Sequence, residues 1–296
     1  MYRADDPVPL HAVQNGARLF SAPDLPDHPA LARYAIAGPD DLRAGARRWA
    51  DDWVAQLTPA QVDRYAVAFD ALIATARNHD LGAEDIACEV LSTLPLPVAR
   101  VLERHRLGRF RVTQKASTDV PHDVYRSENA RPEDWIMIGT HDTPPIWQLV
   151  ERWLRDGSAP ARARRVAERL ATSERECARL AEAFARDPGL LAQGHAAELF
   201  ASPARQVLVL LTDLVGIDES YNAPGTISAA NWSLRVPASW RLDYASRLER
   251  GHALNLPGAL AMALRARGGD TAPAHAELLA RLDADALALP QRLRDG

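Results

Sequence analysis

The sequence predicts an α/β protein in which β/α units follow a helical region. Short apolar runs begin near residues 86, 110 and 135, so about 25 residues separate successive starts, which is the repeat expected of β/α units. Helical spacing then continues over residues 145–200 and precedes a fourth apolar run. We therefore expect parallel strands, adjacent in chain order, at residues 86–90, 110–114, 135–140 and 207–211.

Residues 1–85 differ from the rest and are expected to form an irregular segment followed by a helical insertion. Residues 1–39 are rich in Pro and Asp, a composition typical of loops. Apolar residues recur at helical spacing over 40–57 and again over 59–79, which predicts two amphipathic helices. The functional region is therefore expected in residues 86–296.

Composition favours a neutral substrate. The 296 residues are 47% hydrophobic and 25% charged, with a net charge of -4, so neither nucleic acid nor an anionic membrane is an expected partner. No run of apolar residues is long enough to span a membrane, and the first residues do not read as a signal peptide. The two cysteines, Cys88 and Cys177, indicate neither a disulfide framework nor a zinc site. We expect a cytoplasmic protein without metal or cofactor.

Polar residues follow three of the predicted strands. Glu89 comes after the first, Gln114 after the second, and His141 with Asp142 after the third. In (β/α)8 barrels the functional residues lie at the carboxyl ends of the strands, where the loops meet on one face. The pattern is consistent with a shared site, although strands commonly end in polar residues.

The most specific segment is residues 135–143, WIMIGTHDT. It resembles the signature of the 4-α-glucanotransferases (amylomaltases or disproportionating enzymes, glycoside hydrolase family 77), in which Gly-Thr-His-Asp ends the seventh barrel strand. The resemblance implies that Asp142 stabilises the oxocarbenium-like transition state and that His141 contacts the same sugar. A fixed carboxylate binds more strongly as positive charge grows at the anomeric carbon. Taken alone, a His-Asp pair after a strand is also explained as a helix cap with its neighbour.

The segment around Glu89 resembles the place of the general acid/base. Residues 86–93, IACEVLST, occupy the position of the family's fifth strand, where its Glu-Asp-Leu-Gly motif occurs. The resemblance implies that Glu89 is the acid/base. Val90 replaces the Asp of the motif and Ser92 replaces the Gly, which indicates a divergent subfamily. The alternative is a glutamate at a strand end that faces solvent.

Two further segments resemble loops of the same family. Residues 222–226, NAPGT, are similar to its Asn-x-Pro-Gly-Thr segment, and residues 231–235, NWSLR, to Asn-Trp-x-Trp-Arg, with Leu234 in place of the second Trp. The resemblance implies that Asn222 and Trp232 bind substrate, with the indole offering a flat face to a sugar ring. A plain turn and a core tryptophan are the alternatives.

These segments together imply a fold and an activity. The fold is the C-terminal half of a (β/α)8 TIM barrel, strands 5 to 8, with extra helices. The activity is transfer of α-1,4-glucan segments between maltooligosaccharides by a retaining mechanism, with Glu89 and Asp142 as catalytic residues and an α-glucan as ligand.

The family's nucleophilic Asp lies in an Arg-x-Asp-His segment upstream of the acid/base, and no such segment precedes Glu89. We therefore expect a truncated chain that lacks the nucleophile and whose missing N-terminal half is a possible partner. The alternatives are a non-catalytic α-glucan-binding protein derived from the enzyme, and an incomplete coding sequence with no role of its own.

Overall fold

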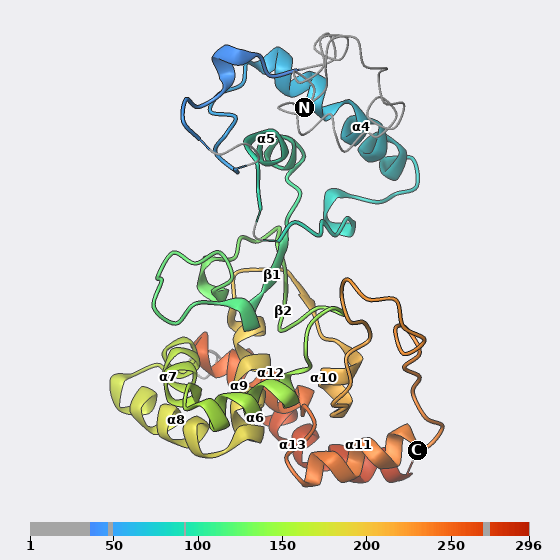
Figure 1. Ribbon diagram of the computed structural model, residues 1–296. Helices are drawn as coiled ribbons and strands as arrows, with labels where there is room; N and C mark the ends of the chain where they lie inside the picture. Colours follow the sequence, from blue (N-terminus) through green and yellow to red (C-terminus); the bar gives the residue numbers. More distant parts are fainter. Residues whose placement is uncertain (1–35, 47–49, 92, 269–272, 296) are drawn as a thin grey trace. The chain divides into compact units, whose positions relative to one another are not determined.

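The computed structural model describes residues 36–46, 50–91, 93–268 and 273–295. They divide into two compact units, on either side of the bond between Arg109 and Phe110, and each unit has its own hydrophobic core. The elements are labelled in Figure 1. Most of the expected irregular N-terminal segment lies outside the described residues. The predicted division at residue 85 separates a helical insertion from the C-terminal half of a barrel, and this division stays a prediction.

Two helices dominate the first unit. Its described elements are η2 (Pro39–Asp41), α4 (Pro59–Arg77), η3 (Ala83–Asp85) and α5 (Leu96–His105). Helix α4 begins at a capping box, because the Thr58 hydroxyl accepts from Gln61 N and the Gln61 side chain accepts from Thr58 N at 2.7 Å. Pro59 follows as the first helical residue, where its missing N–H costs nothing. The helix predicted over 59–79 is confirmed.

The helix predicted over 40–57 is wrong. Within the described part of this range, Leu42 and Val54 instead pair in an antiparallel bridge, supported by a bond from Arg43 N to Trp53 O of 2.8 Å. Gly45 lies between them with φ of +76°, a left-handed conformation that turns the chain where a helix would have continued. Sequence spacing alone did not reveal this reversal.

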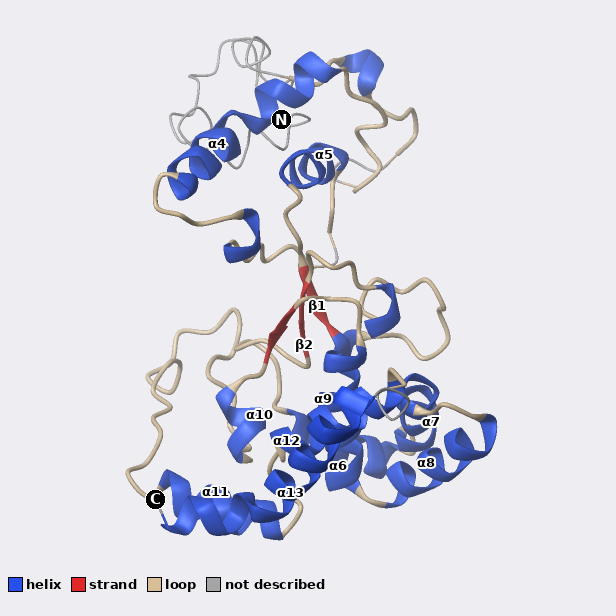
Figure 2. Ribbon diagram, turned by 180° about the vertical axis from the view of Figure 1, so that it is seen from behind, coloured by secondary structure: helices blue, strands red, loops and turns tan. Residues whose placement is uncertain are grey.

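The second unit contains a three-stranded parallel sheet, drawn in red in Figure 2. Its strands β1 (Phe110–Val112), β2 (Trp135–Met137) and β3 (Gln206–Leu208) are adjacent in chain order. The α/β class and the parallel order of these three strands are confirmed, although each strand is shorter than expected. Of the segment 86–90, only Cys88 pairs, in a parallel bridge with Arg109 of the same unit. The assignment to strands 5 to 8 of a barrel stays a prediction.

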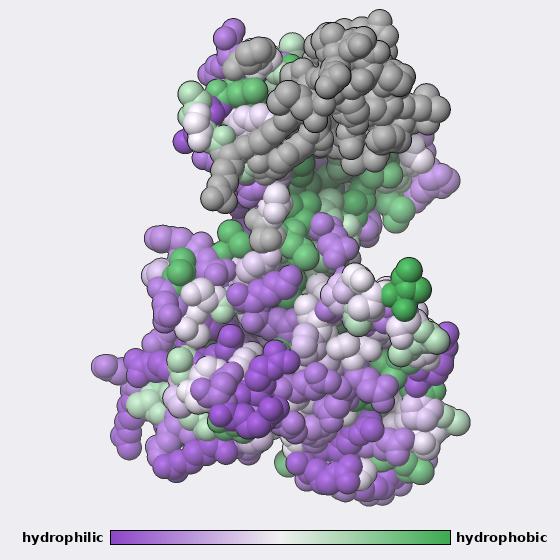
Figure 3. Space-filling model, in the orientation of Figure 1, coloured by the Kyte–Doolittle hydropathy of each residue, from purple (hydrophilic) through white to green (hydrophobic). Residues whose placement is uncertain are grey.

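Helices make up most of the second unit. They are α6 (Ile146–Asp156), α7 (Ala159–Leu170), α8 (Glu174–Arg186), α9 (Pro188–Ala201), α10 (Leu211–Val215), α11 (Trp240–Glu249), α12 (Leu256–Ala266) and α13 (Pro273–Asp295). The core is built around α9, whose Leu191, Ala196 and Leu199 are fully buried. The face of this unit in Figure 3 is correspondingly mostly hydrophilic. Among the described helices, none combines the length and apolarity that crossing a bilayer requires.

A buried ionic network joins three elements of this core. Glu198 of α9 is fully buried and accepts from both terminal nitrogens of the Arg165 guanidinium in α7, at 2.6 and 2.8 Å. Ser127, in η5 (Ser127–Asn129), donates to the same carboxylate at 3.0 Å. Burial alone would raise the pKa of Glu198, but Arg165 and His195 hold it well below its usual range. The charge is therefore kept and paired, as buried charges must be.

Candidate functional site

The segment after β2 forms a tight turn that presents Asp142. The Thr143 hydroxyl accepts from Thr140 N at 2.8 Å and donates to Thr140 O at 2.9 Å. Gly139 precedes the turn, and a Cβ at that position would lie 2.6 Å from Thr143 Oγ1 and 3.1 Å from Gln114 Nε2. Because no real Cβ approaches an atom that closely, the turn requires glycine here. Thus the Gly-Thr-His-Asp order has a local structural cause.

A second segment, the loop after α10, is joined to this turn by three hydrogen bonds. Asn222 Nδ2 donates to Asp142 Oδ1 at 2.6 Å, and Asn222 N donates to His141 O at 3.2 Å. Ser220 Oγ donates to Thr143 O, also at 3.2 Å. The Asp142 side chain keeps 35% of its surface exposed. The carboxylate is therefore held in place and still accessible to a ligand.

Trp232 lies against His141 in the same cluster. The two ring centroids are 4.9 Å apart and the rings are tilted by 42°, while His141 Nε2 is 3.4 Å from Asp142 Oδ1. Trp232 has φ of +62°, an uncommon conformation for a bulky residue, and its N–H donates to Tyr221 O at 2.7 Å. The residue is 56% exposed, so the alternative that Trp232 packs in the core is wrong.

The structure brings four of the five candidate residues together. Asp142, His141, Asn222 and Trp232 form one cluster in the second unit. Glu89 belongs to the first unit, where it is exposed and directly follows the bridge made by Cys88. The role of Glu89 as acid/base, and its approach to Asp142, stay predictions.

Sequence reasoning missed Asp213, which anchors the start of α6, the helix that follows the Asp142 turn. Helix α6 begins just after Pro144 and Pro145, which have no N–H to cap, and Asp213 Oδ1 accepts from Ile146 N at 2.8 Å. Trp147 Nε1 donates to Asp213 O, also at 2.8 Å. Burial raises the pKa of the Asp213 carboxyl to about 6, against the lowering effect of the bond from Ile146. A cap supplied from 67 residues away leaves no local pattern to read.

Sequence reasoning also left Asn231 without a role, although the motif containing it was noted. Its Oδ1 accepts from Ala223 N at 3.1 Å, and its Nδ2 donates to Thr226 O at 3.0 Å. These bonds close the loop between Asn222 and Trp232, so they help to place both. The signal was present, since Asn commonly closes turns through its side chain.

The cluster can bind hydroxyl groups and stabilise positive charge. A carboxylate supplies acceptors, an amide and an imidazole supply donors and acceptors, and the exposed indole offers an apolar face. No group of three or more His, Cys, Asp or Glu side chains that could hold a metal occurs in the part of the chain that the structure describes. An exposed carboxylate beside an aromatic face, after a strand of a parallel sheet, defines an α/β protein with a site suited to polar, hydroxyl-bearing ligands.

Comparison with known families agrees with this class. The model of glycoside hydrolase family 77, described as 4-alpha-glucanotransferase, matches residues 47–240, well over half of the chain. The chain belongs to this family. No curated protein matches it.

Two solved structures are similar to part of the chain. An amylomaltase from Streptococcus agalactiae in complex with acarbose is 19% identical with a TM-score of 0.42, over 57% of this chain and 31% of that chain. An amylomaltase from Corynebacterium glutamicum is 22% identical with a TM-score of 0.34, over 50% of this chain and 24% of that chain. The chain thus spans less than a third of the length of either amylomaltase.

Proposed function

We propose that this chain takes part in the transfer of α-1,4-glucan segments between maltooligosaccharides by a retaining mechanism, with Asp142 as the stabilising carboxylate. One observation carries the proposal. The Asp142 carboxylate is bound by Asn222 and lies beside His141 and Trp232, in a family of 4-α-glucanotransferases. Two segments about 80 residues apart in sequence thus supply the groups that a sugar ring needs.

Asp142 would act on the sugar whose glycosidic bond breaks. Its Oδ1 is occupied by Asn222, and within the described residues no group hydrogen-bonds to Oδ2. We assign Oδ2 to a sugar hydroxyl, with Trp232 against the ring and His141 at a second hydroxyl. As the bond to the leaving oxygen lengthens, positive charge spreads over the anomeric carbon and ring oxygen, and the nearby carboxylate lowers the energy of that state.

Glu89 would supply the proton transfers. As an acid it protonates the departing glycosidic oxygen, and as a base it then takes the proton from the 4-hydroxyl of the incoming sugar. A retaining mechanism also needs a covalent nucleophile between these steps. No Arg-x-Asp-His segment precedes Glu89 in this sequence, so we propose that the nucleophile comes from residues outside it. A cytoplasmic location stays a prediction.

A second candidate function is α-glucan binding without catalysis. It is favoured by the division of the candidates, because all four residues that would bind the sugar lie in the second unit whereas Glu89 lies in the first. Binding by the cluster therefore does not depend on the acid/base. Such a protein would hold maltooligosaccharides and release them unchanged.

Glucose release from maltotriose distinguishes the two candidates. The purified 296-residue chain alone should release no more glucose than its Glu89→Gln variant, because loss of the nucleophile removes most of a retaining enzyme's rate. Adding the N-terminal half of an amylomaltase should restore transfer, and Asp142→Asn should abolish the restored activity. Asp119→Asn, an exposed change outside the cluster, is the matched control. Binding of maltotriose without any restored transfer would favour the non-catalytic function.

A further inference from the structure

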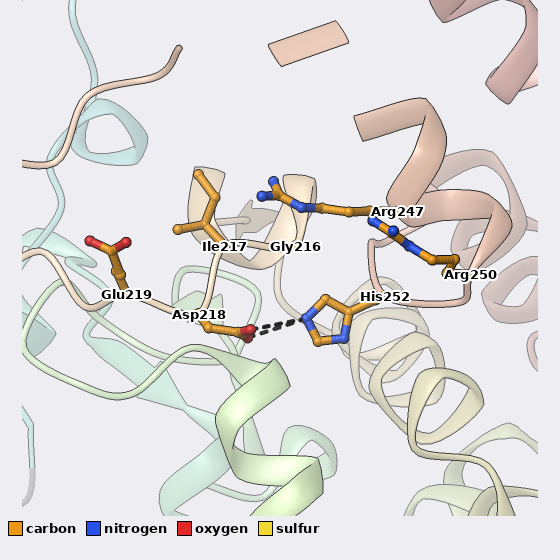
Figure 4. Close-up of a pocket in the computed structure, with 7 residues that line it drawn as sticks. All are labelled: Gly216, Ile217, Asp218, Glu219, Arg247, Arg250 and His252. Atoms are coloured by element: carbon orange, nitrogen blue, oxygen red, sulfur yellow. Dashed lines mark hydrogen bonds and ion pairs between the residues drawn. The ribbon is translucent and has the colours of Figure 1, made fainter. Parts of the chain in front are cut away.

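A second concave site lies in the same unit, between the loop after α10 and the end of α11. It has a volume of about 550 Å³, and none of the four clustered residues lines it. Figure 4 shows its charged side chains, with the Asp218 carboxylate directed at the His252 imidazole. They are Asp218, Glu219, Arg247, Arg250 and His252.

The walls of this pocket are fixed by backbone contacts. Gly216 has φ of +77°, and a Cβ there would lie 1.9 Å from His252 O, so the two segments touch where only glycine fits. Leu254 N donates to Leu214 O at 3.0 Å, and Arg247 donates to Val215 O at 3.1 Å. The pocket is therefore formed before any ligand binds, which lowers the entropic cost of binding.

The charges in the pocket balance, and this decides the class of ligand. Two arginines and two carboxylates line the pocket, and His252 Nε2 is 3.3 Å from both oxygens of Asp218. Arg250 and Glu219 are exposed, and among the described residues neither side chain has a hydrogen-bond or ion-pair partner. The carboxylates would repel an anion, and the arginines would repel a cation. A neutral ligand whose groups both donate and accept, as sugar hydroxyls do, matches all of them.

We propose that this pocket is a second α-glucan-binding site, separate from the cluster around Asp142. The identity of the sugar rests on the proposed function. One loop serves both sites, because Asp218 lines the pocket while Asn222 binds Asp142. That loop is fastened between them by Gln148, which donates to Asp218 O, and by Ser220, which donates to Thr143 O.

The test is a maltotriose titration of the full chain followed by NMR. The His252 imidazole and Arg250 guanidinium signals report on the pocket, and the Trp232 indole signal reports on the cluster. We expect both sets to shift and saturate. Arg250→Ala should weaken binding at the pocket by about tenfold, since a bond from a charged donor is lost, and leave the Trp232 curve unchanged. Glu219→Gln should also weaken maltotriose binding at the pocket. Arg241→Ala, a change of an exposed arginine in the first turn of α11, should change neither curve.

Several outcomes overturn the proposal. His252 signals that respond to inorganic phosphate but not to maltotriose would define an anion site, and signals that respond to neither would define no site. Arg250→Ala and Arg241→Ala with equal effects would point to a general change of charge. Saturation at the pocket with no response at Trp232 would leave this inference standing and remove the proposed function. A response at Trp232 without saturation at the pocket would overturn this inference and leave the proposed function standing.

Discussion

The amide of Asn222 makes the contact that fixes the candidate carboxylate. Its 2.6 Å hydrogen bond to Asp142 joins residues that are 80 positions apart in the sequence, so no sequence neighbour of Asp142 supplies this contact. Asn222→Ala should lower the affinity for maltotriose by about tenfold, because a charge-assisted hydrogen bond is lost. Fluorescence of the exposed Trp232 can follow the titration.

The matched control for this change is Asn129→Ala. The Asn129 amide donates to Pro121 O and Asp123 O, and it takes no part in the cluster. The control should leave the affinity unchanged. An Asn222→Ala variant with the affinity of the unmodified chain would show that this bond does not position a sugar ligand.

Gly139 tests the turn that carries Asp142. Gly139→Ala brings a Cβ within 2.6 Å of Thr143 Oγ1, and overpacking of this kind typically lowers the free energy of unfolding by about 1–3 kcal/mol. Urea unfolding measures the change. Gly258→Ala is the control, because its Cβ would meet its nearest neighbours at 3.4 Å or more and alanine favours a helix. Equal stability of the two variants would contradict the tight turn.

At the scale of elements, Asp213 makes the anchoring of α6 sensitive to pH. Burial raises the pKa of its carboxyl from 3.8 to about 6, so the folded chain binds this proton more tightly than the unfolded chain does. The resulting stabilisation is complete below pH 3.8 and is lost as the pH rises through about 6. The loss from this group is roughly 3 kcal/mol.

Asp213→Asn isolates that effect. The Asn side chain keeps an acceptor for Ile146 N but does not titrate, so the variant should gain stability relative to the unmodified chain as the pH is raised from about 4 to about 7. Urea unfolding across this range measures the difference, and the other titrating groups cancel in the comparison. Two curves that stay parallel would show that the Asp213 carboxyl has an ordinary pKa.

The elements that could be predicted are those specified by nearby residues. Helix α4 has its cap, its proline and its apolar spacing within one segment, so its start was readable. The helix expected over 40–57 failed because the spacing of apolar residues does not show that Leu42 pairs with Val54. Three of the four expected strands were placed correctly but too long, since η4 (Thr113–Lys115) and the turn at Thr140 end the first two of them early. The strand expected over 86–90 was wrong, because only Cys88 pairs there, in an isolated bridge.

The same distinction applies to the candidate site. Motifs that are visible in the sequence contain four of the candidate residues: His141, Asp142, Asn222 and Trp232. The structure places these four together. Asp213 was not predictable, because its partner Ile146 lies 67 residues earlier and no motif joins them. Contacts made across the fold, by residues of common type, require the structure.

At the scale of the whole molecule, the proposed chemistry needs both compact units. The cluster around Asp142 belongs to the second unit and Glu89 to the first, although a general acid and the carboxylate that stabilises the transition state must act on one glycosidic bond. Under the proposed function, substrate binding would be a property of one unit, and catalysis would be a property of the assembled protein. The proposed catalysis therefore depends on how the two units are arranged in the ligand-bound state.

The last prediction concerns that arrangement. In a crystal structure of the full chain with maltotriose bound and the N-terminal half supplied, the carboxylates of Glu89 and Asp142 should lie within about 10 Å of each other, the scale on which paired carboxyl groups flank a glycosidic bond. His141 and Trp232 should line the same cleft. The Glu89→Gln variant is the control, since it keeps the shape of the side chain and slows turnover of the sugar. Carboxylates much farther apart in that bound state would remove the roles given to both residues, because a proton donor that does not reach the leaving oxygen cannot assist its departure. Membership of the family would still stand.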